Sequence, residues 1–313
     1  MAFRCLELTF RDSLSKGDQL QSELLGVDIG GTHFRMGFVS NDGGVIGHKS
    51  LPTPSFSTSF DAFVDLRQLI DPDHQAKRLV VGVPGVVDYK EQRLIYAPNI
   101  PQNFVPELNS KAISENLQVE TLIVNDADLA AIGEANFGAG RGSESMAYIT
   151  ISTGVGAAVV VDKHLLRSRH SIAELGHSFI DALSATVDGV GSVELMASGT
   201  ALGMIAKEEG VALPNAEIVK RATAGDIECA RLVERLAHNA AVSMANMVHL
   251  FSVDTIVLGG GVSLSGDYFF NLAVEGFNRL CPPYFSVEVK RAELGDEAGL
   301  SGAGAAFDAF EMN

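Results

Sequence analysis

A pair of glycines follows an apolar run near the start of the chain and is the first place where chemistry could occur. The segment reads Asp28-Ile29-Gly30-Gly31-Thr32. Glycines let backbone N–H groups approach phosphate oxygens, Thr32 adds a hydroxyl donor, and Asp28 can hold a hydrated Mg²⁺. A glycine pair after a strand is also a common tight turn. This segment alone leaves both interpretations open.

Two later segments have similar chemistry. Thr153-Gly154-Val155-Gly156 follows another apolar run, and Gly259-Gly260-Gly261 follows a third, where an adenosine could lie flat against bare backbone. Three unrelated turns would explain the same glycines. Because each loop follows a β-rich apolar run, the set favours a nucleotide site.

Asn125-Asp126 lies between an apolar run, Thr121 to Val124, and a helical pattern. Asp126 could therefore be a helix N-cap, which is a frequent use of aspartate. A phosphotransferase also needs a carboxylate that accepts the proton of the attacking hydroxyl. Both roles can coexist.

Glu174 and His177 lie three residues apart, on one face if the segment is helical. Either side chain could hydrogen-bond sugar hydroxyls. Such a pair alone is more often a local surface contact.

The elements that must position these residues form an internal repeat. Strands are predicted at 24–28, 34–39 and 45–48, with turn residues at 41–44, and the same order recurs at 147–151, 157–161 and 164–166. Each copy carries a glycine loop between its first two strands. We expect two lobes that grip one nucleotide in a shared cleft.

The remaining patterns alternate between strands and helices. Strands are predicted at 79–83, 121–124 and 255–258, and helices at 60–70, 127–136, 193–206, 229–250 and 299–310. This alternation predicts an α/β protein. The first 23 residues show no strong period and are interpreted as an extension of unknown role.

Length and charge narrow the function further. The 313 residues are enough for two domains, and the formal net charge of −16 disfavours nucleic acid and anionic membranes as partners. Cys5, Cys229 and Cys281 form no metal or disulfide pattern, so we expect a cytoplasmic protein. Charged residues interrupt positions 1–20, which argues against a signal peptide, and the uncharged run Ser145 to Val161 is interpreted as two buried strands.

Taken in order, these motifs resemble the ROK group (repressors, open reading frames, kinases) of the actin-like ATPase superfamily, from about Leu24 to Phe307. The matching stretches are Gly26-Val-Asp-Ile-Gly-Gly-Thr32, Gly82-Val-Pro-Gly85, Ala97-Pro-Asn-Ile-Pro101, Val124-Asn-Asp-Ala127, Ser152-Thr-Gly-Val-Gly156, Ala173-Glu-Leu-Gly-His177, Leu258-Gly-Gly-Gly-Val262 and Gly299-Leu-Ser-Gly-Ala-Gly304.

The resemblance implies a two-lobed, ribonuclease H-like fold with a duplicated βββαβα unit. It places residues 24–125 and 300–313 in a small domain and 126–299 in a large one. It further implies an ATP- and Mg²⁺-dependent sugar kinase, commonly a homodimer, whose glycine loops bind ATP and whose base is Asp126. The sugar contacts that it implies are Asn99, Asn125, Asp126, Glu174, His177 and Glu194.

The chain departs from the family in two places. The family's zinc cysteines correspond to Ala185, Val187 and Ser192, so we expect no zinc, with apolar packing in its place and His177 left for the sugar. Arg167-Ser-Arg-His-Ser171 and Ala157-Ala158 stand where the family has glycines, which suggests an altered sugar-facing loop.

Several alternatives remain at this point. A glucose-type hexose phosphorylated at the 6-position is the first choice of substrate, followed by N-acetylmannosamine, N-acetylglucosamine or fructose. A sugar-sensing regulator without its DNA-binding domain is disfavoured, because 23 residues before Leu24 do not hold two helices. Asp126 argues against a dead sugar-binding protein, and Glu174 with His177 argue against an acetate or glycerol kinase.

Overall fold

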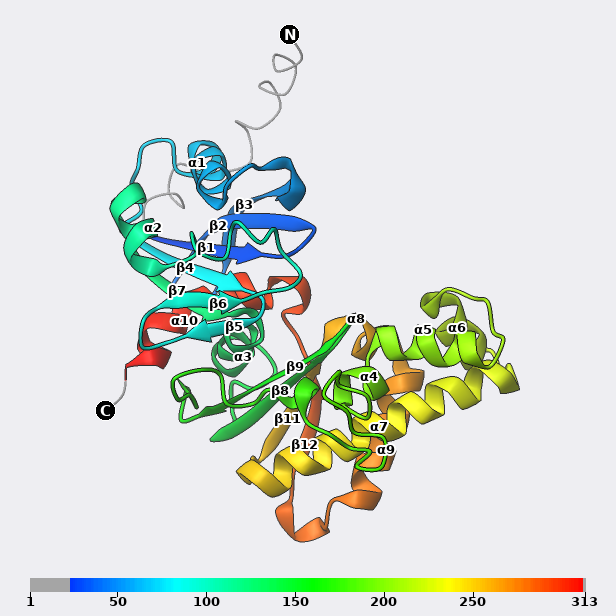
Figure 1. Ribbon diagram of the computed structural model, residues 1–313. Helices are drawn as coiled ribbons and strands as arrows, with labels where there is room; N and C mark the ends of the chain where they lie inside the picture. Colours follow the sequence, from blue (N-terminus) through cyan, green and yellow to red (C-terminus); the bar gives the residue numbers. More distant parts are fainter. Residues whose placement is uncertain (1–22, 312–313) are drawn as a thin grey trace.

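The computed structural model describes residues 23–311, which form two lobes, each built on a five-stranded mixed sheet (Figure 1). The first sheet has the order β3-β2-β1-β4-β7 and the second has β10-β9-β8-β11-β12. The strands of the first sheet are β1 (Leu24–Ile29), β2 (His33–Val39), β3 (Val45–Pro52), β4 (Arg78–Val83) and β7 (Glu120–Asn125). Those of the second are β8 (Ser145–Ile151), β9 (Val155–Val161), β10 (His164–Leu165), β11 (Thr255–Gly259) and β12 (Glu288–Arg291).

The two sheets have the same topology. In each, the first three strands are antiparallel neighbours, and the first strand also pairs in parallel with a later strand, which pairs in parallel with the last. The predicted internal repeat is therefore confirmed. A short hairpin of β5 (Val86–Asp88) and β6 (Arg93–Tyr96), which the sequence analysis did not predict, is added to the first lobe.

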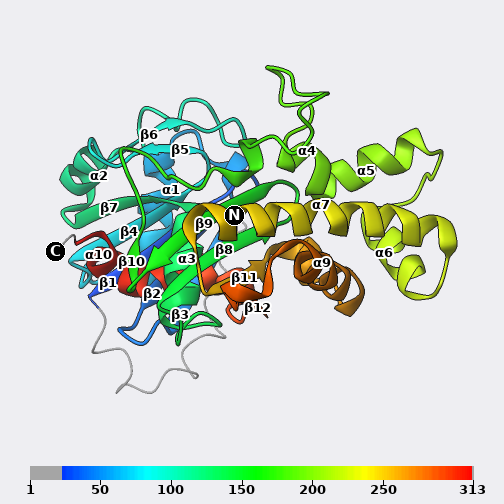
Figure 2. The same cartoon turned by 90° about the horizontal axis from the view of Figure 1, so that it is seen from below.

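Helices cover both sheets. They are α1 (Ser59–Ile70), α2 (Ser110–Leu117), α3 (Asp126–Asn136), α4 (Val193–Ala197), α5 (Gly199–Glu208), α6 (Asn215–Thr223), α7 (Ile227–Phe251), α8 (Gly260–Ser263), α9 (Asp267–Leu280) and α10 (Ala298–Phe310). The long helix α7 runs along the second lobe beside α9, with α5 and α6 near its far end (Figure 2). No helix within residues 23–311 is both long and apolar enough to cross a membrane.

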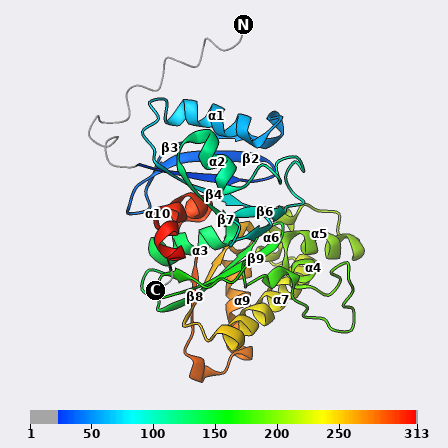
Figure 3. The same cartoon turned by 60° about the vertical axis from the view of Figure 1, so that its left-hand side comes forward.

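Two apolar cores hold the lobes together. One includes side chains of the first sheet, and the other packs the second sheet against α7 and α9. Helices α3 and α10 lie side by side between the sheets (Figure 3), and their apolar side chains belong to the first core. The proposed domain boundary at residue 125 thus falls at the start of a helix that packs in the first core.

Four local expectations were wrong, and each has a physical reason. The helix predicted at 193–206 is interrupted at Ser198, whose extended backbone lets its hydroxyl cap α5 at the Ala201 N–H. Asn125, not Asp126, is the N-cap of α3, because its carboxamide oxygen accepts from the N–H groups of Ala127 and Asp128. Gly260 and Gly261 begin the short helix α8 instead of forming a loop.

The fourth wrong expectation is a helix at the segment of Glu174 and His177. The segment is a single 3₁₀ turn, Leu175–His177, preceded by Glu174. The other predicted elements are confirmed to within a few residues. The extension expected at residues 1–23 lies, apart from Glu23, outside the described residues.

Candidate active site

Two adjoining cavities lie at the strand ends that face the second lobe's glycine loops. The first, of about 480 Å³, is lined by residues that include Asp28, Arg35, Asp126, Gly260 and Gly261. The second, of about 450 Å³, is lined by Ser152, Thr153, Gly199, Thr200, Gly203, Asn215, Gly261 and Val262. Ser152 and Gly261 line both cavities, so the two are adjacent, and together they are called the cleft.

Asp126 lines the first of these cavities, as the first residue of α3. Its side chain is exposed to solvent at the cavity, and the surrounding protein partly desolvates it. This partial burial, together with the charges of Asp28 and Glu174, raises the pKa of Asp126 to about 7, although the N–H of Ala127 donates to Oδ1 at 2.8 Å. Its pKa is therefore near that of an effective general base at neutral pH.

Asp28 stands opposite Arg35 in the β1–β2 hairpin, and the two side chains form an ion pair. The Nε atom of Arg35 lies 3.1 Å from Oδ2 of Asp28, and Nη1 donates to the carbonyl of Asp296 at 3.1 Å. Both bonds of Arg35 to Asp28 go to Oδ2. Oδ1 can therefore accept from a metal-bound water.

A network of hydrogen bonds around Asn125 fixes the start of α3. Asn125 is buried, and its side-chain N–H donates to the Gly85 carbonyl at 2.8 Å. Its backbone N–H donates to the Tyr89 hydroxyl at 3.2 Å, and that hydroxyl donates to the carboxylate of Asp128. Burial raises the pKa of Asp128 to about 7, against the lowering effect of the Tyr89 and Ser171 hydroxyls. Asn125 therefore holds backbone groups, and its contact with a sugar stays a prediction.

A close approach to backbone requires glycine at one position of the first phosphate loop. A Cβ atom on Gly31 would lie 2.2 Å from the carbonyl oxygen of Asn99, so the first loop packs directly on the segment of a predicted sugar contact. Gly30 donates its N–H to the His33 carbonyl at 2.8 Å, which closes the loop around Thr32. Gly31, Thr32 and Asn99 are exposed.

The second loop packs on another predicted sugar contact, Glu194. Oε2 of Glu194 accepts from the Val155 N–H at 3.1 Å, and a Cβ on Gly154 would lie 2.4 Å from the same oxygen. The Thr153 carbonyl accepts from the Thr200 hydroxyl at 2.7 Å, which ties the loop to α5. The loop that carries Gly156 is thus braced by groups from two helices.

Glu174 and His177 are exposed, and their charges are close enough to interact. Burial of part of the side chain raises the pKa of Glu174, the His177 charge lowers it, and the Glu194 charge raises it. Asp126 and Glu174 also influence each other. Asp28, Asp126, Glu174 and Glu194 therefore form a series of interacting carboxylates, of which Asp28 and Asp126 line the first cavity.

The expected apolar replacement for zinc is not found. Val187 is 99% exposed and Leu183 is 100% exposed, so this loop has no apolar core. Hydrogen bonds hold it instead: the Gly191 carbonyl accepts from the N–H groups of Ile180 and Asp181 at 3.0 and 3.2 Å, and the Ser192 hydroxyl caps α4. Gly191 is needed for its φ of +83°. Within residues 23–311 no group of three or more His, Cys, Asp and Glu side chains could hold a metal ion.

The site nevertheless fits Mg²⁺ that arrives with a nucleotide. Such a Mg²⁺ commonly uses one or two carboxylates, with phosphate oxygens and water as its other ligands. Asp28 and Asp126 line the same cavity and could supply those carboxylates, directly or through water.

The sequence analysis missed several residues that shape the site. Arg35 could have been found, because a hairpin in which the four residues 30–33 separate the paired strands puts it opposite Asp28. Tyr89 and Asp128 could not, because they meet only through the unpredicted β5–β6 hairpin.

Duplicated mixed sheets, a cleft between them, and glycine loops from both copies define an actin-like ATPase fold. The ROK family model matches residues 24–309, and the chain therefore belongs to the ROK family.

The chain is similar to proteins named glucokinase and N-acetylmannosamine kinase. It is 30% identical to a glucokinase of Streptomyces coelicolor, over 89% of this chain and 95% of that protein. It is also 30% identical to an N-acetylmannosamine kinase of Escherichia coli O157:H7, over 89% and 96%. The crystal structure of a ROK glucokinase from Streptomyces griseus, in complex with glucose and AMPPNP, matches with a TM-score of 0.76 and 29% identity, over 90% of this chain and 98% of that one.

Proposed function

We propose that this protein transfers the γ-phosphoryl group of ATP to a hydroxyl of a hexose, with Asp126 as the general base. The observation that carries the proposal is the position of Asp126. It sits at the strand-to-helix junction and lines the same cavity as Asp28 and the glycines of α8. Sugar kinases among its relatives support the reaction class.

The phosphoryl donor would lie across the two adjacent cavities. Backbone N–H groups of Gly31, Thr32, Thr153 and Gly154 would face its phosphates, and the adenosine would occupy the cavity between Thr153, Asn215 and Gly261. Mg²⁺ bound with ATP would neutralise charge on the phosphates. Asp28 would orient the metal-bound water, and Arg35 would hold Asp28 in place.

The sugar would lie between the two loops that pack on Asn99 and Glu194. Asn99 from the first lobe, and Glu174, His177 and Glu194 from the second, would hydrogen-bond its hydroxyls, with Asn125 fixing the helix start behind them. Asp126 would accept the proton of the attacking hydroxyl as that oxygen reaches the phosphorus atom. A primary hydroxyl, the 6-position of glucose, is the least hindered acceptor in such a site.

The relatives favour two acceptor classes. Glucose is the first choice, because glucokinases match over nearly the whole chain, and N-acetylmannosamine is the second. A cytoplasmic location is supported by Cys229 and Cys281, which are free and buried. A homodimer stays a prediction.

A coupled assay with Asp126→Asn tests the proposal. With glucose, N-acetylmannosamine, N-acetylglucosamine and fructose offered in turn, the native enzyme should turn over at least one sugar. The variant should lose about 10²- to 10⁴-fold in kcat, because it cannot accept the proton, while sugar binding measured by calorimetry persists. No turnover of any sugar by the native protein would refute the kinase reaction.

A further inference from the structure

A five-residue segment of the second lobe, Arg167–Ser171, contacts the first lobe and its bordering helices; we name it the strap. It connects β10 to the turn that begins at Glu174. Arg167 donates to the Phe310 carbonyl at the end of α10 at 2.7 Å. A ring nitrogen of His170 lies 3.0 Å from the Val87 carbonyl of β5.

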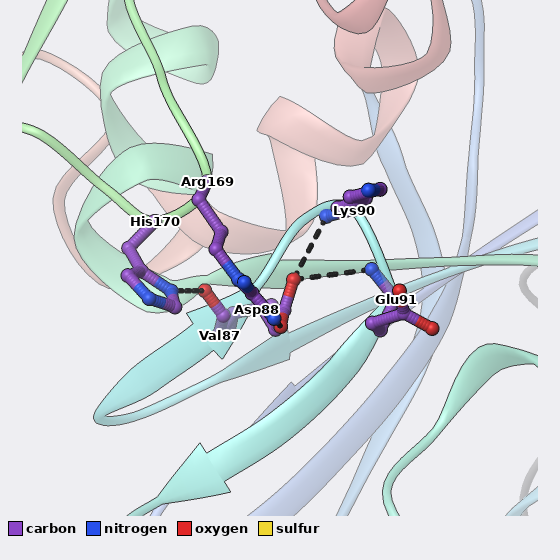
Figure 4. A network of polar contacts seen from close by, with 6 residues as sticks. All are labelled: Val87, Asp88, Lys90, Glu91, Arg169 and His170. Atoms are coloured by element: carbon purple, nitrogen blue, oxygen red, sulfur yellow. Dashed lines mark hydrogen bonds and ion pairs between the residues drawn. The ribbon is translucent and has the colours of Figure 1, made fainter.

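The central contact of the strap is an ion pair between Arg169 and Asp88 (Figure 4). Nε and Nη2 of Arg169 donate to Oδ2 of Asp88 at 3.0 and 2.8 Å. The other oxygen accepts from the N–H groups of Lys90 and Glu91, each at 3.1 Å. The Asp88 side chain is 1% exposed and that of Arg169 is 61% exposed. Asp88 is thus a carboxylate built into the hairpin, and Arg169 closes its open side.

A main-chain hydrogen bond accompanies the Arg169–Asp88 ion pair. The N–H of Tyr89 donates to the carbonyl of Arg169 at 2.8 Å, so the strap is joined to the hairpin by main chain as well as by side chain. Tyr89 is the residue whose hydroxyl bonds both Asn125 and Asp128. A displacement of the strap would therefore move Tyr89 and, through it, the groups that hold the start of α3.

Two further features direct the strap toward the acceptor site. The Ser171 hydroxyl donates to Oδ1 of Asp128 at 3.0 Å, two residues along α3 from Asp126. Only Ile172 and the buried Ala173 separate Ser171 from Glu174. The strap ends where the sugar-binding turn begins, and it is anchored to the helix that carries the base.

We propose that Arg169 and Asp88 are positioning residues for the acceptor: their contact fixes the strap, and so the distance between the Glu174–His177 turn and Asp126. This inference rests on the proposed sugar kinase function. The ATP cavities have no lining residue in the strap or in the β5–β6 hairpin. The pair should therefore control the acceptor sugar and leave the nucleotide almost unaffected.

The test compares Arg169→Ala and Arg169→Lys with the native enzyme, using whichever sugar the native enzyme phosphorylates. Arg169→Ala should raise KM for the sugar about tenfold, because a charged contact to a buried carboxylate is lost, with KM for ATP changed less than about twofold. Arg169→Lys keeps a charged donor, so its KM for the sugar should lie between those of the native enzyme and of Arg169→Ala. Arg235→Ala is the matched control, since it removes an exposed ion pair with Glu209 within the second lobe and should change neither KM.

A second readout separates positioning from mere stability. Arg169 is largely exposed, so added salt should weaken its contact and raise KM for the neutral sugar in the native enzyme more than in Arg169→Ala. Asp88→Asn, which keeps the two backbone hydrogen bonds, should reproduce the sugar defect if Arg169→Ala folds poorly.

Equal rises of both KM values, or a lower melting temperature with an unchanged sugar KM, would overturn the positioning role. If the native enzyme phosphorylates no sugar, the proposed function fails. If it does so and the Arg169 variants match it, only the positioning role fails.

Discussion

Asp126 lies among carboxylates that oppose its ionisation, and this sets the pH dependence of the proposed reaction. As a base it must be ionised, and its pKa is raised to about 7 by burial and then by the charge of Asp28. Activity should therefore rise as pH increases through about 7. Arg35 moderates the effect, because it pairs with Asp28.

Asp28→Asn should move the acid limb of kcat/KM to lower pH. Removal of the Asp28 charge lowers the pKa of Asp126, by roughly a few tenths of a unit to one unit, so the base is ionised in more acidic solution. A pH profile of kcat/KM for the sugar measures the midpoint, which is independent of any loss of rate through Mg²⁺ binding.

Asp296→Asn is the control for this profile. Asp296 lines the same cavity, but only its backbone carbonyl contacts Arg35, and its charge is not among the causes of the raised pKa of Asp126. Its midpoint should match that of the native enzyme. A midpoint that stays fixed or rises in Asp28→Asn would contradict the assigned role of Asp28.

At the scale of elements, prediction from sequence succeeded where period and composition agreed. The strand at 255–258 and the helix at 229–250 were predicted, and they are observed at Thr255–Gly259 and Ile227–Phe251. The strand is a short apolar run, and the helix combines regular apolar spacing with the absence of Pro and Gly. The break at Ser198 was missed because the apolar spacing continues through it, and only the capping bond to Ala201 reveals it. The strap contacts could not be foreseen, since they join residues 43 to 143 positions apart.

The contact between α3 and α10 depends on glycine, and Gly302→Ala tests it. A Cβ at Gly302 would lie 1.9 Å from the Leu129 carbonyl oxygen of α3, so the helices must separate. The substitution should lower the free energy of unfolding by about 1–3 kcal/mol, the usual cost of overpacking, as measured by urea denaturation.

Gly299→Ala in the same helix provides the comparison. A Cβ there meets no atom within 4 Å, and alanine favours a helix over glycine by up to about 1 kcal/mol. Its stability should equal or slightly exceed that of the native protein. A loss in Gly299→Ala as large as that in Gly302→Ala would show that the close approach of α3 does not decide the outcome.

At the scale of the molecule, the duplicated topology brings Asp28, near the end of the first strand of one copy, and Ser152, directly after the first strand of the other, to one cavity. The resemblance anticipated this arrangement, because the order and spacing of the motifs reflect the whole fold. It did not predict how the loop at the family's zinc position is held. The loop is held by hydrogen bonds to the Gly191 carbonyl, and such backbone contacts cannot be read from residue types. The two cavities meet at Ser152 and Gly261, which makes Gly261 a place where nucleotide binding can be tested apart from folding.

Gly261→Val should abolish nucleotide binding while the protein stays folded. A Cβ at Gly261 meets no atom within 4 Å, and its φ is not in the left-handed region, so a Cβ can be added there without strain. It would then occupy the space shared by the two cavities. In the native protein, Mg²⁺-AMPPNP at 100 times its Kd should stabilise the folded state by about 2.7 kcal/mol, seen as a rise in melting temperature.

The variant should lose most of this rise and keep the one caused by sugar, because the predicted sugar contacts at Asn99, Glu174 and Glu194 do not line either cavity. Gly142→Val is the matched control: Gly142 is also open to solvent space, has no left-handed φ and lines neither cavity, so both ligand responses should persist. An undiminished AMPPNP response in Gly261→Val would place the nucleotide elsewhere. Loss of both responses with unchanged stability would instead show that nucleotide and sugar share this part of the cleft.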